Sequence, residues 1–363
     1  MSGLAPDTRV LVDARWLGLG GAGRATEYLL RGLRELQPAG RWLLWGTAAV
    51  RPYAWPTAEV HETTRSPHWQ PSQFAIPYMP AHDVALYMHQ VRPLRPGRAV
   101  TLIHDTMQLR FGSSGWRKLA KRVSHHVVAR LSTSFVTVSE YSKATIERDL
   151  GIDGERLRVV RYPVDNEFVT RVRSLHATLP GVDRALYVGQ FATHKNLERL
   201  IAGFGETTFA ARGGQLLLVG GDGNWQDRLR RVAGLVAPGV SVTVEGAVAQ
   251  ERLEELYATS RLLAMPSLEE GFGLPAWEAL SLGLPVCAST AGSLPEVTAG
   301  RATLCDPTSI PDIARALDEA ASQSWGCVIS GPSMRDFAQE FVDEIAAVVN
   351  SERGQRSPMP VRS

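Results

Sequence analysis

Cysteine is scarce in this sequence of 363 residues. Its three cysteines, Cys287, Cys305 and Cys327, do not have the spacing of metal ligands, and the first two lie in apolar runs typical of buried strands. No stretch approaches the roughly 20 apolar residues that a membrane-spanning helix needs, and the N-terminus lacks the basic and apolar segments of a secretion signal. The sequence therefore predicts a cytoplasmic protein without a disulfide scaffold.

Neither sign of charge dominates, since Lys and Arg total 39 and Asp and Glu total 37. The distribution is uneven: residues 1–165 carry 22 basic and 14 acidic side chains, and the rest of the chain carries 17 and 23. A basic half can face an anionic membrane surface or a phosphate-bearing substrate, or it can consist of scattered solvated arginines. The arginines are dispersed and not interleaved with aromatic residues, which argues against nucleic acid as a partner.

Short apolar runs alternate with stretches of helical spacing along the chain, and a length of roughly 150 residues per domain predicts two domains. In the first half, strands are expected at 9–13, 41–45, 84–87, 99–103, 135–138 and 157–160. In the second half they are expected at 185–188, 215–219, 242–245, 262–265, 285–288 and 303–305. This alternation predicts an α/β fold with doubly wound parallel sheets, which bind ligands at the carboxyl ends of their strands.

Two features set the expected domain boundaries. Residues 166–184 show no convincing period and contain Leu179-Pro180-Gly181, which breaks regular structure. Apolar residues recur every four positions from Phe337 to Val349 and predict a final amphipathic helix. The predicted parts are an N-terminal domain at 1–170, a linker at 171–184, a C-terminal domain at 185–330, the final helix at 331–350 and a disordered tail at 351–363.

The most informative segment is Met265–Glu278, where a buried strand is followed by a glycine-containing turn and by a helix that begins at Pro275. Proline suits the first helical turn because its missing N–H costs no hydrogen bond there. The free N–H groups of a helix N-terminus form an anion site, and Gly271 and Gly273 let a ligand approach the backbone closely.

Two carboxylates, Glu270 and Glu278, flank this predicted anion site with seven residues between them. The Glu278 carboxylate can accept both hydroxyl hydrogens of a ribose diol, or it can simply be an acidic residue placed favourably near a helix N-terminus. The segment resembles the Glu-x7-Glu signature of retaining glycosyltransferases with the GT-B fold, in particular glycosyltransferase family 4. The resemblance covers nearly all of residues 185–320. Further segments similar to that family's donor-domain landmarks are 188–197, 218–223 and 292–297.

The resemblance implies two Rossmann-like domains that face each other across a cleft. It also implies that Glu278 holds the donor ribose, that Glu270 contacts the donor sugar near the reacting carbon, and that Lys195 neutralises the leaving diphosphate. Lys195 follows a strand and a glycine turn, from which its ammonium could reach the crevice; a solvated side chain is the alternative for a single lysine. Contacts to the donor sugar, phosphate or base are expected from Gly189, Val248, Gly271, Phe272, Gly273 and Leu274.

One departure from the family pattern concerns the positive charge beside the diphosphate. Many relatives place an arginine directly after the glycine or directly before the lysine, where this chain has Gln190 and His194. Three explanations stay open: His194 helps when it is protonated, an arginine from the other domain substitutes, or leaving-group stabilisation is weak.

The N-terminal half contains a glycine-rich segment, Gly18–Gly23, between a strand and a helix expected near Ala25. Its spacing matches the dinucleotide fingerprint, but the next expected strand is not followed by the acidic residue that an NAD ribose needs. In GT-B relatives a glycine-rich loop at this position approaches the donor phosphates and the acceptor. The resemblance therefore assigns Gly20 and Gly21 to substrate binding, and a plain flexible loop is the alternative.

His104 follows an apolar run and precedes an aspartate, so it lies at the carboxyl end of an expected strand. A single histidine in such a place is usually structural. The resemblance to the His-Asp segment of many family members makes His104 a candidate catalytic residue that contacts the donor sugar rather than acting as a general base.

Residues 116–131 form an expected basic helix with Trp116, Leu119, Val123 and Val127 along one side. That side could rest on an anionic membrane, giving peripheral association at its inner face. The alternative is an ordinary surface helix that packs the same side on the sheet.

Together these features predict a retaining glycosyltransferase that transfers a hexose, with mannose favoured, from a GDP or UDP sugar. The acceptor would be a glycan, a lipid-linked molecule or a small molecule in polysaccharide or glycoconjugate biosynthesis. No Asp-X-Asp pair is available to hold a divalent ion on the diphosphate, so no metal and no cofactor are predicted. The alternatives are a nucleotide-sugar epimerase or hydrolase of the same fold, and a non-catalytic nucleotide-sugar binding protein.

Overall fold

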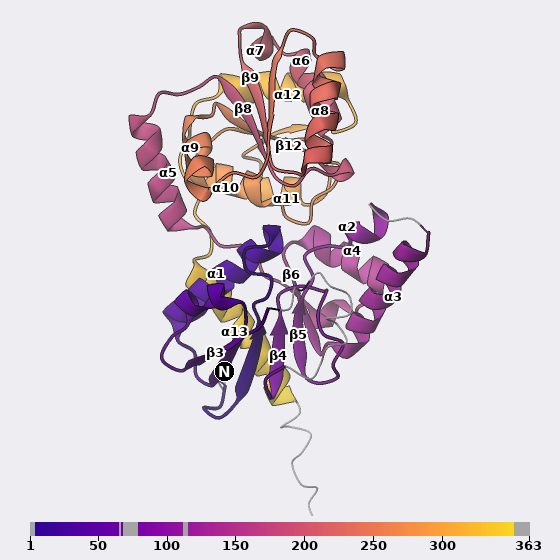
Figure 1. Ribbon diagram of the computed structural model, residues 1–363, viewed down its shortest axis with the longest axis vertical. Helices are drawn as coiled ribbons and strands as arrows, with labels where there is room; N and C mark the ends of the chain where they lie inside the picture. The colour runs from indigo at the N-terminus through magenta and orange to yellow at the C-terminus, as the bar shows by residue number, and fades with distance from the viewer. Residues whose placement is uncertain (1–3, 65–66, 68–78, 112–114, 352–363) are drawn as a thin grey trace, which may run out of the picture. The chain divides into compact units, whose positions relative to one another are not determined.

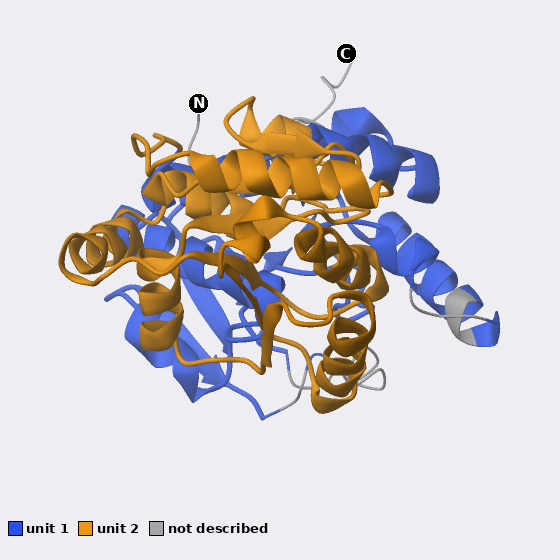
Figure 2. Ribbon diagram, turned by 90° about the horizontal axis from the view of Figure 1, so that it is seen from above, with its two compact units in different colours: residues 1–163, 332–363 blue, residues 164–331 orange. Residues whose placement is uncertain are grey.

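The structure is a computed structural model that describes residues 4–64, 67, 79–111 and 115–351. The chain forms two compact units, coloured separately in Figure 2. Unit 1 comprises residues 1–163 and 332–363, and unit 2 comprises residues 164–331. The expected tail lies, apart from Ser351, outside the described residues.

Unit 1 is built on a parallel sheet whose described strands follow the order β3-β2-β1-β4-β5-β6-β7. Side chains of the central strands are buried on both faces, as in sheets covered by helices on each side. The strands are β1 (Arg9–Asp13), β2 (Arg41–Gly46), β3 (Ala58–Glu62), β4 (Val84–Tyr87), β5 (Ala99–Leu102), β6 (Ser134–Thr137) and β7 (Leu157–Val159).

Helices surround this sheet, and the final helix of the chain packs against the first (Figure 1). The contact between the two is close at Gly32, because a Cβ there would lie 2.0 Å from the Met334 carbonyl oxygen. The described helices of unit 1 are α1 (Gly20–Leu36), the 3-10 helix η1 (Ala48–Tyr53), α2 (Met107–Arg110), α3 (Gly115–Leu131), α4 (Glu140–Leu150), the 3-10 helix η4 (Gly154–Arg156) and α13 (Met334–Ser351).

Unit 2 has a second parallel sheet, in the order β10-β9-β8-β11-β12-β13. Alternate residues of one strand serve different cores: Ala185 and Tyr187 pack into one, and Leu186 packs into the other. The strands are β8 (Arg184–Val188), β9 (Gln215–Val219), β10 (Ser241–Glu245), β11 (Leu262–Met265), β12 (Val286–Ser289) and β13 (Thr303–Cys305).

Helices cover both faces of this sheet, with α6, α8 and α12 on one core and α5, α9 and α10 on the other. The expected doubly wound α/β architecture is therefore confirmed in both units. The helices of unit 2 are α5 (Asn166–Thr178), the 3-10 helix η5 (Thr193–Lys195), α6 (Leu197–Gly205), α7 (Thr208–Ala211), α8 (Gly223–Val236), α9 (Gln250–Thr259), α10 (Leu274–Leu282), α11 (Leu294–Thr298) and α12 (Ile310–Ser322).

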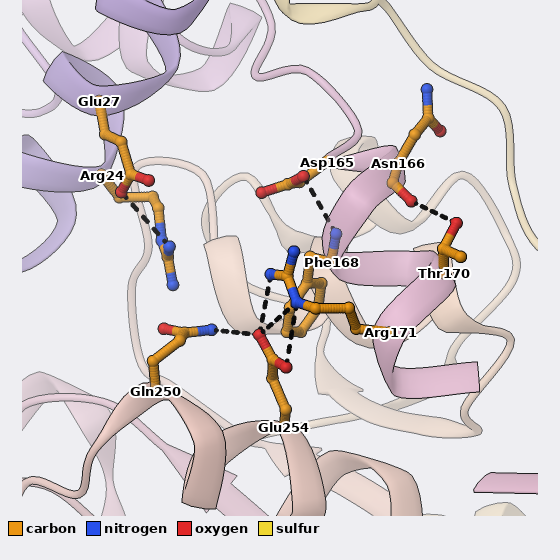
Figure 3. Close-up of polar contacts among 9 residues, drawn as sticks. All are labelled: Arg24, Glu27, Asp165, Asn166, Phe168, Thr170, Arg171, Gln250 and Glu254. Carbon is orange, nitrogen blue, oxygen red and sulfur yellow. Dashed lines mark hydrogen bonds and ion pairs between the residues drawn. The ribbon is translucent and has the colours of Figure 1, made fainter. Parts of the chain in front are cut away.

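The segment expected to be an irregular linker differs in the structure, because its first part is the helix α5. Asp165 caps this helix by accepting a hydrogen bond from Phe168 N at 3.1 Å. Only Phe168 and Val172 are buried, so the apolar period is too short to recognise. Arg171 on α5 donates hydrogen bonds of 2.9–3.2 Å to the Glu254 carboxylate of α9 (Figure 3). The final helix also differs, since it belongs to unit 1 rather than standing apart.

None of the described helices is both long enough and apolar enough to cross a membrane.

The packing of α1 on α13 predicts the effect of two alanine substitutions in one helix. Gly32→Ala should lower the free energy of unfolding by roughly 1–3 kcal/mol, because the new methyl group overlaps the backbone of α13. Gly21→Ala is the control, since a Cβ there meets nothing within 4 Å, and it should be neutral or stabilise by up to about 1 kcal/mol. Urea denaturation measures both, and equal stabilities for the two variants would contradict this packing.

Candidate functional site

The candidate site lies where the strand order of unit 2 reverses. Strands β8 and β11 are neighbours at this point, although β9 and β10 come between them in the sequence. In open parallel sheets the segments that follow two such strands part from each other and leave room for ligands at the carboxyl edge. Lys195 follows β8 and Glu270 follows β11. Two of the predicted residues therefore come from the two strands that flank the reversal.

The segment that carries Lys195 is fixed by its neighbour Asn196. Asn196 has a left-handed backbone with φ of 61°, and its buried side chain donates from Nδ2 to the carbonyls of Pro266 at 2.9 Å and Pro307 at 2.6 Å. A further bond joins Leu268 N to the His194 carbonyl at 2.7 Å. The turn after β8 is thus fastened to the segments after β11 and β13.

The backbone of Glu270 is held from the other side by the loop after β12. Ser293 donates to the Glu270 carbonyl from its backbone N at 3.2 Å and from Oγ at 3.0 Å. Gly292 lies so close that a Cβ there would be 2.7 Å from Glu270 N, and its φ of 68° also favours glycine. Gly292 and Ser293 therefore hold the Glu270 backbone in place.

The side chains of Lys195 and Glu270 form an ion pair. Lys195 Nζ donates to both carboxylate oxygens, at 2.7 and 2.8 Å, and Ser267 Oγ donates to Oε1 at 2.7 Å. The side chains are only 15% and 5% exposed, so the charges are largely removed from water. Removing one partner of such a pair leaves an uncompensated buried charge. A charged ligand can therefore bind Lys195 or Glu270 only if it replaces a contact within this pair.

Glu278 lies in the first turns of α10, as expected. The helix begins at Leu274 after Gly273, which has a left-handed φ of 88°, and Pro275 occupies its first turn. The Glu278 Oε2 atom accepts a hydrogen bond from the hydroxyl of the buried Tyr257 at 2.9 Å. Tyr257 therefore helps to hold the carboxylate in one orientation.

The other predicted binding residues differ in how closely they are packed against the rest of unit 2. Phe272 is buried with its ring against Trp277 at 5.9 Å, so its side chain serves the core and only its backbone can serve a ligand. Gly189, at the end of β8, contacts Gly220, where a Cβ would lie 2.0 Å from the Gly189 carbonyl oxygen. Val248 follows the edge strand β10 and packs partly into the core. Their roles in donor binding stay predictions, as does that of Gly271.

His194 bears on one of the explanations for the missing arginine. Burial, together with the neighbouring Lys195 ammonium, lowers the pKa of His194 to about 4. The imidazole is therefore uncharged at neutral pH in the protein without a donor, and a bound diphosphate would have to raise this pKa before His194 could act as a second cation. All three explanations stay open.

In unit 1, His104 follows β5 at the carboxyl edge of the sheet, as predicted. Its Nε2 donates to the Met88 carbonyl at 3.2 Å, and its Nδ1 accepts from the Tyr162 hydroxyl at 2.8 Å. Burial lowers its pKa to about 4, so the ring is neutral. Both nitrogens are engaged within unit 1, and a substrate contact would have to replace one of these bonds.

The glycine-rich segment is partly helical. Helix α1 begins at Gly20, so Gly20 and Gly21 lie in its first turn rather than in a loop that precedes a helix near Ala25. The first turn carries no acidic side chain, and the space beside Gly21 is open. The expectation of a flexible loop is therefore wrong for these two glycines, and their assignment to substrate binding stays a prediction.

Sequence reasoning missed the residues that hold the site residues in place. Ser267 and Ser293 lie inside segments that the family resemblance had already marked, so their position was a usable signal. Tyr257 and Tyr162 lie 21 residues from Glu278 and 58 from His104. Nothing in their local sequence distinguishes them from core tyrosines.

The sequence is similar to known proteins over part of its length. Residues 178–339 match the family model described as Glycosyl transferases group 1. O-antigen chain mannosyltransferase B of Escherichia coli is 28% identical over 247 residues, which are 64% of this chain and 64% of that protein. MMP alpha-(1->4)-mannosyltransferase of Mycolicibacterium hassiacum is 29% identical over 195 residues, which are 50% of this chain and 42% of that protein. The matches span less than two thirds of these relatives' own length.

Solved structures resemble almost the whole chain in fold. Sucrose-phosphate synthase from Thermosynechococcus elongatus has a TM-score of 0.64 at 19% identity, over 96% of this chain and 98% of that one. Anabaena HepE in complex with UDP and glucose has a TM-score of 0.66 at 18% identity, again over 96% and 98%. The fold is thus the GT-B fold of glycosyltransferases. Residues 178–339 are thus similar to group 1 glycosyltransferases, and the named relatives include mannosyltransferases.

The environment of Glu270 predicts that Ser267 stabilises unit 2 more than an ordinary buried serine does. Ser267→Ala removes a hydrogen bond to a charged carboxylate, so the free energy of unfolding should fall by roughly 1.5–3 kcal/mol. Ser281→Ala is the control: that hydroxyl is also buried but bonds only the Trp277 carbonyl within α10, and its loss should cost about 1 kcal/mol or less. Urea denaturation distinguishes them, and equal losses would contradict a special role for Ser267.

The two neutral histidines predict a pH dependence. Their folded pKa of about 4 lies below the unfolded value near 6.5. Between these pH values the unfolded chain binds protons that the folded chain does not, so stability falls as the pH drops through this window. NMR titration of labelled histidines should show His104 and His194 uncharged down to about pH 4, with the urea-unfolded chain as control. Titration of both near pH 6.5 in the folded protein would contradict the burial.

Proposed function

We propose that this protein transfers a hexose, with mannose favoured, from a nucleoside diphosphate sugar to a glycan, lipid-linked or small-molecule acceptor. The observation that carries the proposal is the Lys195–Glu270 ion pair at the strand reversal of unit 2, close in sequence to the N-terminus of α10. A cation and an anion at one carboxyl edge suit a donor that carries a diphosphate at one end and develops positive charge at the other.

Each side chain of the site has a part in the proposed donor complex. Lys195 would turn from Glu270 to the diphosphate and neutralise charge on the leaving group. Glu278, oriented by Tyr257, would accept hydrogen bonds from the ribose hydroxyls. The N–H groups at the start of α10, after Gly273, would bind phosphate or sugar oxygens.

The proposed reaction retains the configuration of the anomeric carbon. The acceptor oxygen forms a bond to that carbon on the face from which the diphosphate leaves, the bond from carbon to the diphosphate oxygen breaks, and the departing diphosphate takes the acceptor proton. Glu270, released from Lys195 but still held by Ser267, would stabilise positive charge on the sugar ring. No divalent ion is assigned a part, because the chain has no Asp-X-Asp pair to hold one.

The named relatives support the choice of substrates. Two curated relatives are mannosyltransferases, one of them of an O-antigen chain. The fold neighbours include a protein solved with UDP and glucose and one described as involved in lipopolysaccharide biosynthesis. A GDP or UDP sugar as donor and a place in cell-surface polysaccharide synthesis, at the cytoplasmic face of the membrane, fit these relatives.

One observation favours a second candidate, a non-catalytic nucleotide-sugar binding protein of the same fold; a nucleotide-sugar hydrolase or epimerase would share the same donor cleft. His194 is neutral and Lys195 is already paired, so the leaving group meets little net positive charge in unit 2. Release of nucleoside diphosphate without an acceptor would favour the hydrolase, and donor binding without turnover would favour the binding protein.

Calorimetry with nucleoside diphosphates in the presence of a chelator tests the donor site. One diphosphate should bind in the micromolar range, and Lys195→Ala and Glu278→Ala should each weaken it at least about tenfold, or 1.4 kcal/mol. Glu251→Ala, which removes a carboxylate from the first turn of α9, is the control and should leave binding unchanged. If no diphosphate binds, or if the control weakens binding as much as the site variants do, the assignment is overturned.

A further inference from the structure

The buried residues of helix α3, among those whose side chains the structure describes, lie in its C-terminal half. Val128 and Ala129 are buried, and Ala129 joins a core cluster with Ile103 and Phe135. His125 is buried on the same side and bonds from Nδ1 to the Lys121 carbonyl at 2.7 Å. Among the described side chains from residue 115 to 124, none is buried. The N-terminal half therefore projects from the edge of unit 1, as Figure 1 shows.

A second apolar side of α3 faces outward. Trp116, Leu119 and Val123, here called the α3 stripe, are 74%, 64% and 54% exposed. At 3.6 residues per turn, positions 116, 119 and 123 share one side of the helix, and positions 125, 128 and 129 share the opposite side. The sequence left open whether the stripe packs on the sheet. The structure shows that the other side is buried, whereas the side chains of the stripe are largely exposed.

The charge around the stripe has one sign. Helix α3 contains several basic residues and no aspartate or glutamate. Arg122 and Arg130 are exposed, and Lys121 is partly so. By helical spacing Arg130 lies on the same side as the stripe, and Arg122 flanks it. Large apolar side chains bordered by basic ones are typical of helices that lie in the interface of an anionic bilayer.

We infer that the α3 stripe docks on the surface of an anionic lipid bilayer. Trp116 and Leu119 would enter the boundary between headgroups and acyl chains, while Arg122 and Arg130 meet the lipid phosphates. The inference rests on the proposed function only where it concerns reaching a lipid-linked acceptor; the docking itself requires no transfer activity.

A second copy of the chain suits the stripe less well. In a two-fold dimer the same patch meets itself, so the basic residues of one α3 would lie against those of the other. Like charges brought together at an interface are unfavourable. An anionic bilayer instead presents negative charge to these basic residues.

Vesicle sedimentation of the full chain tests this inference. Wild-type protein should sediment with vesicles of phosphatidylcholine and phosphatidylglycerol, and at least fivefold less with pure phosphatidylcholine or at high salt. The combined Trp116→Ser, Leu119→Ser and Val123→Ser variant should bind the anionic vesicles at least fivefold more weakly. The matched control is Leu235→Ser with Val236→Ser, which removes two exposed apolar side chains from the end of α8 and should bind like the wild type.

Three results would overturn the inference: no binding to anionic vesicles, equal binding by the stripe variant and the wild type, or self-association of the wild type that the stripe variant abolishes without any vesicle binding. Circular dichroism melting shows whether the variants fold. Calorimetry with the nucleoside diphosphate is measured separately on each variant and should be unchanged. A failed donor titration with intact vesicle binding would overturn the proposed function and not the docking surface.

Discussion

The ion pair between Lys195 and Glu270 is the contact on which the site in unit 2 depends. It joins the segments that follow β8 and β11, the two strands at which the sheet reverses its order. Burying two charges is costly unless each is paired and hydrogen bonded. Asn196, Ser267 and Ser293 provide the surrounding bonds. A carboxylate and a cation are therefore held in place at one carboxyl edge, as the proposed sugar transfer requires.

The titratable groups of the two units are arranged alike. Each unit buries an ion pair and a neutral histidine: Lys195–Glu270 with His194 in unit 2, and Arg15–Asp13 with His104 in unit 1. Neutral imidazoles at His104 and His194 can orient hydroxyl groups but carry no positive charge at neutral pH in the protein without a ligand. Among the described donor segments, Lys195 is the cation that we propose meets the leaving group. A second cation would have to come from another part of the chain.

The sequence predicted most strands to within one or two residues, because strands buried on both faces read as continuous apolar runs. It missed β3, an edge strand whose residues Ala58–Glu62 are only partly buried, and α5, which buries only Phe168 and Val172. The family resemblance led to Glu270, Glu278 and Lys195. It could not predict that Lys195 and Glu270 bond each other 75 residues apart, nor which side of α3 faces out, since both depend on tertiary packing.

The most direct test of this account is a crystal structure of the full chain with the nucleoside diphosphate that binds it. The account predicts that Lys195 Nζ has left Glu270 for a phosphate oxygen, and that the Glu278 carboxylate accepts bonds from the ribose hydroxyls while Tyr257 still donates to it. A nucleotide bound away from the β8 and β11 ends, with the Lys195–Glu270 pair unchanged, would contradict it.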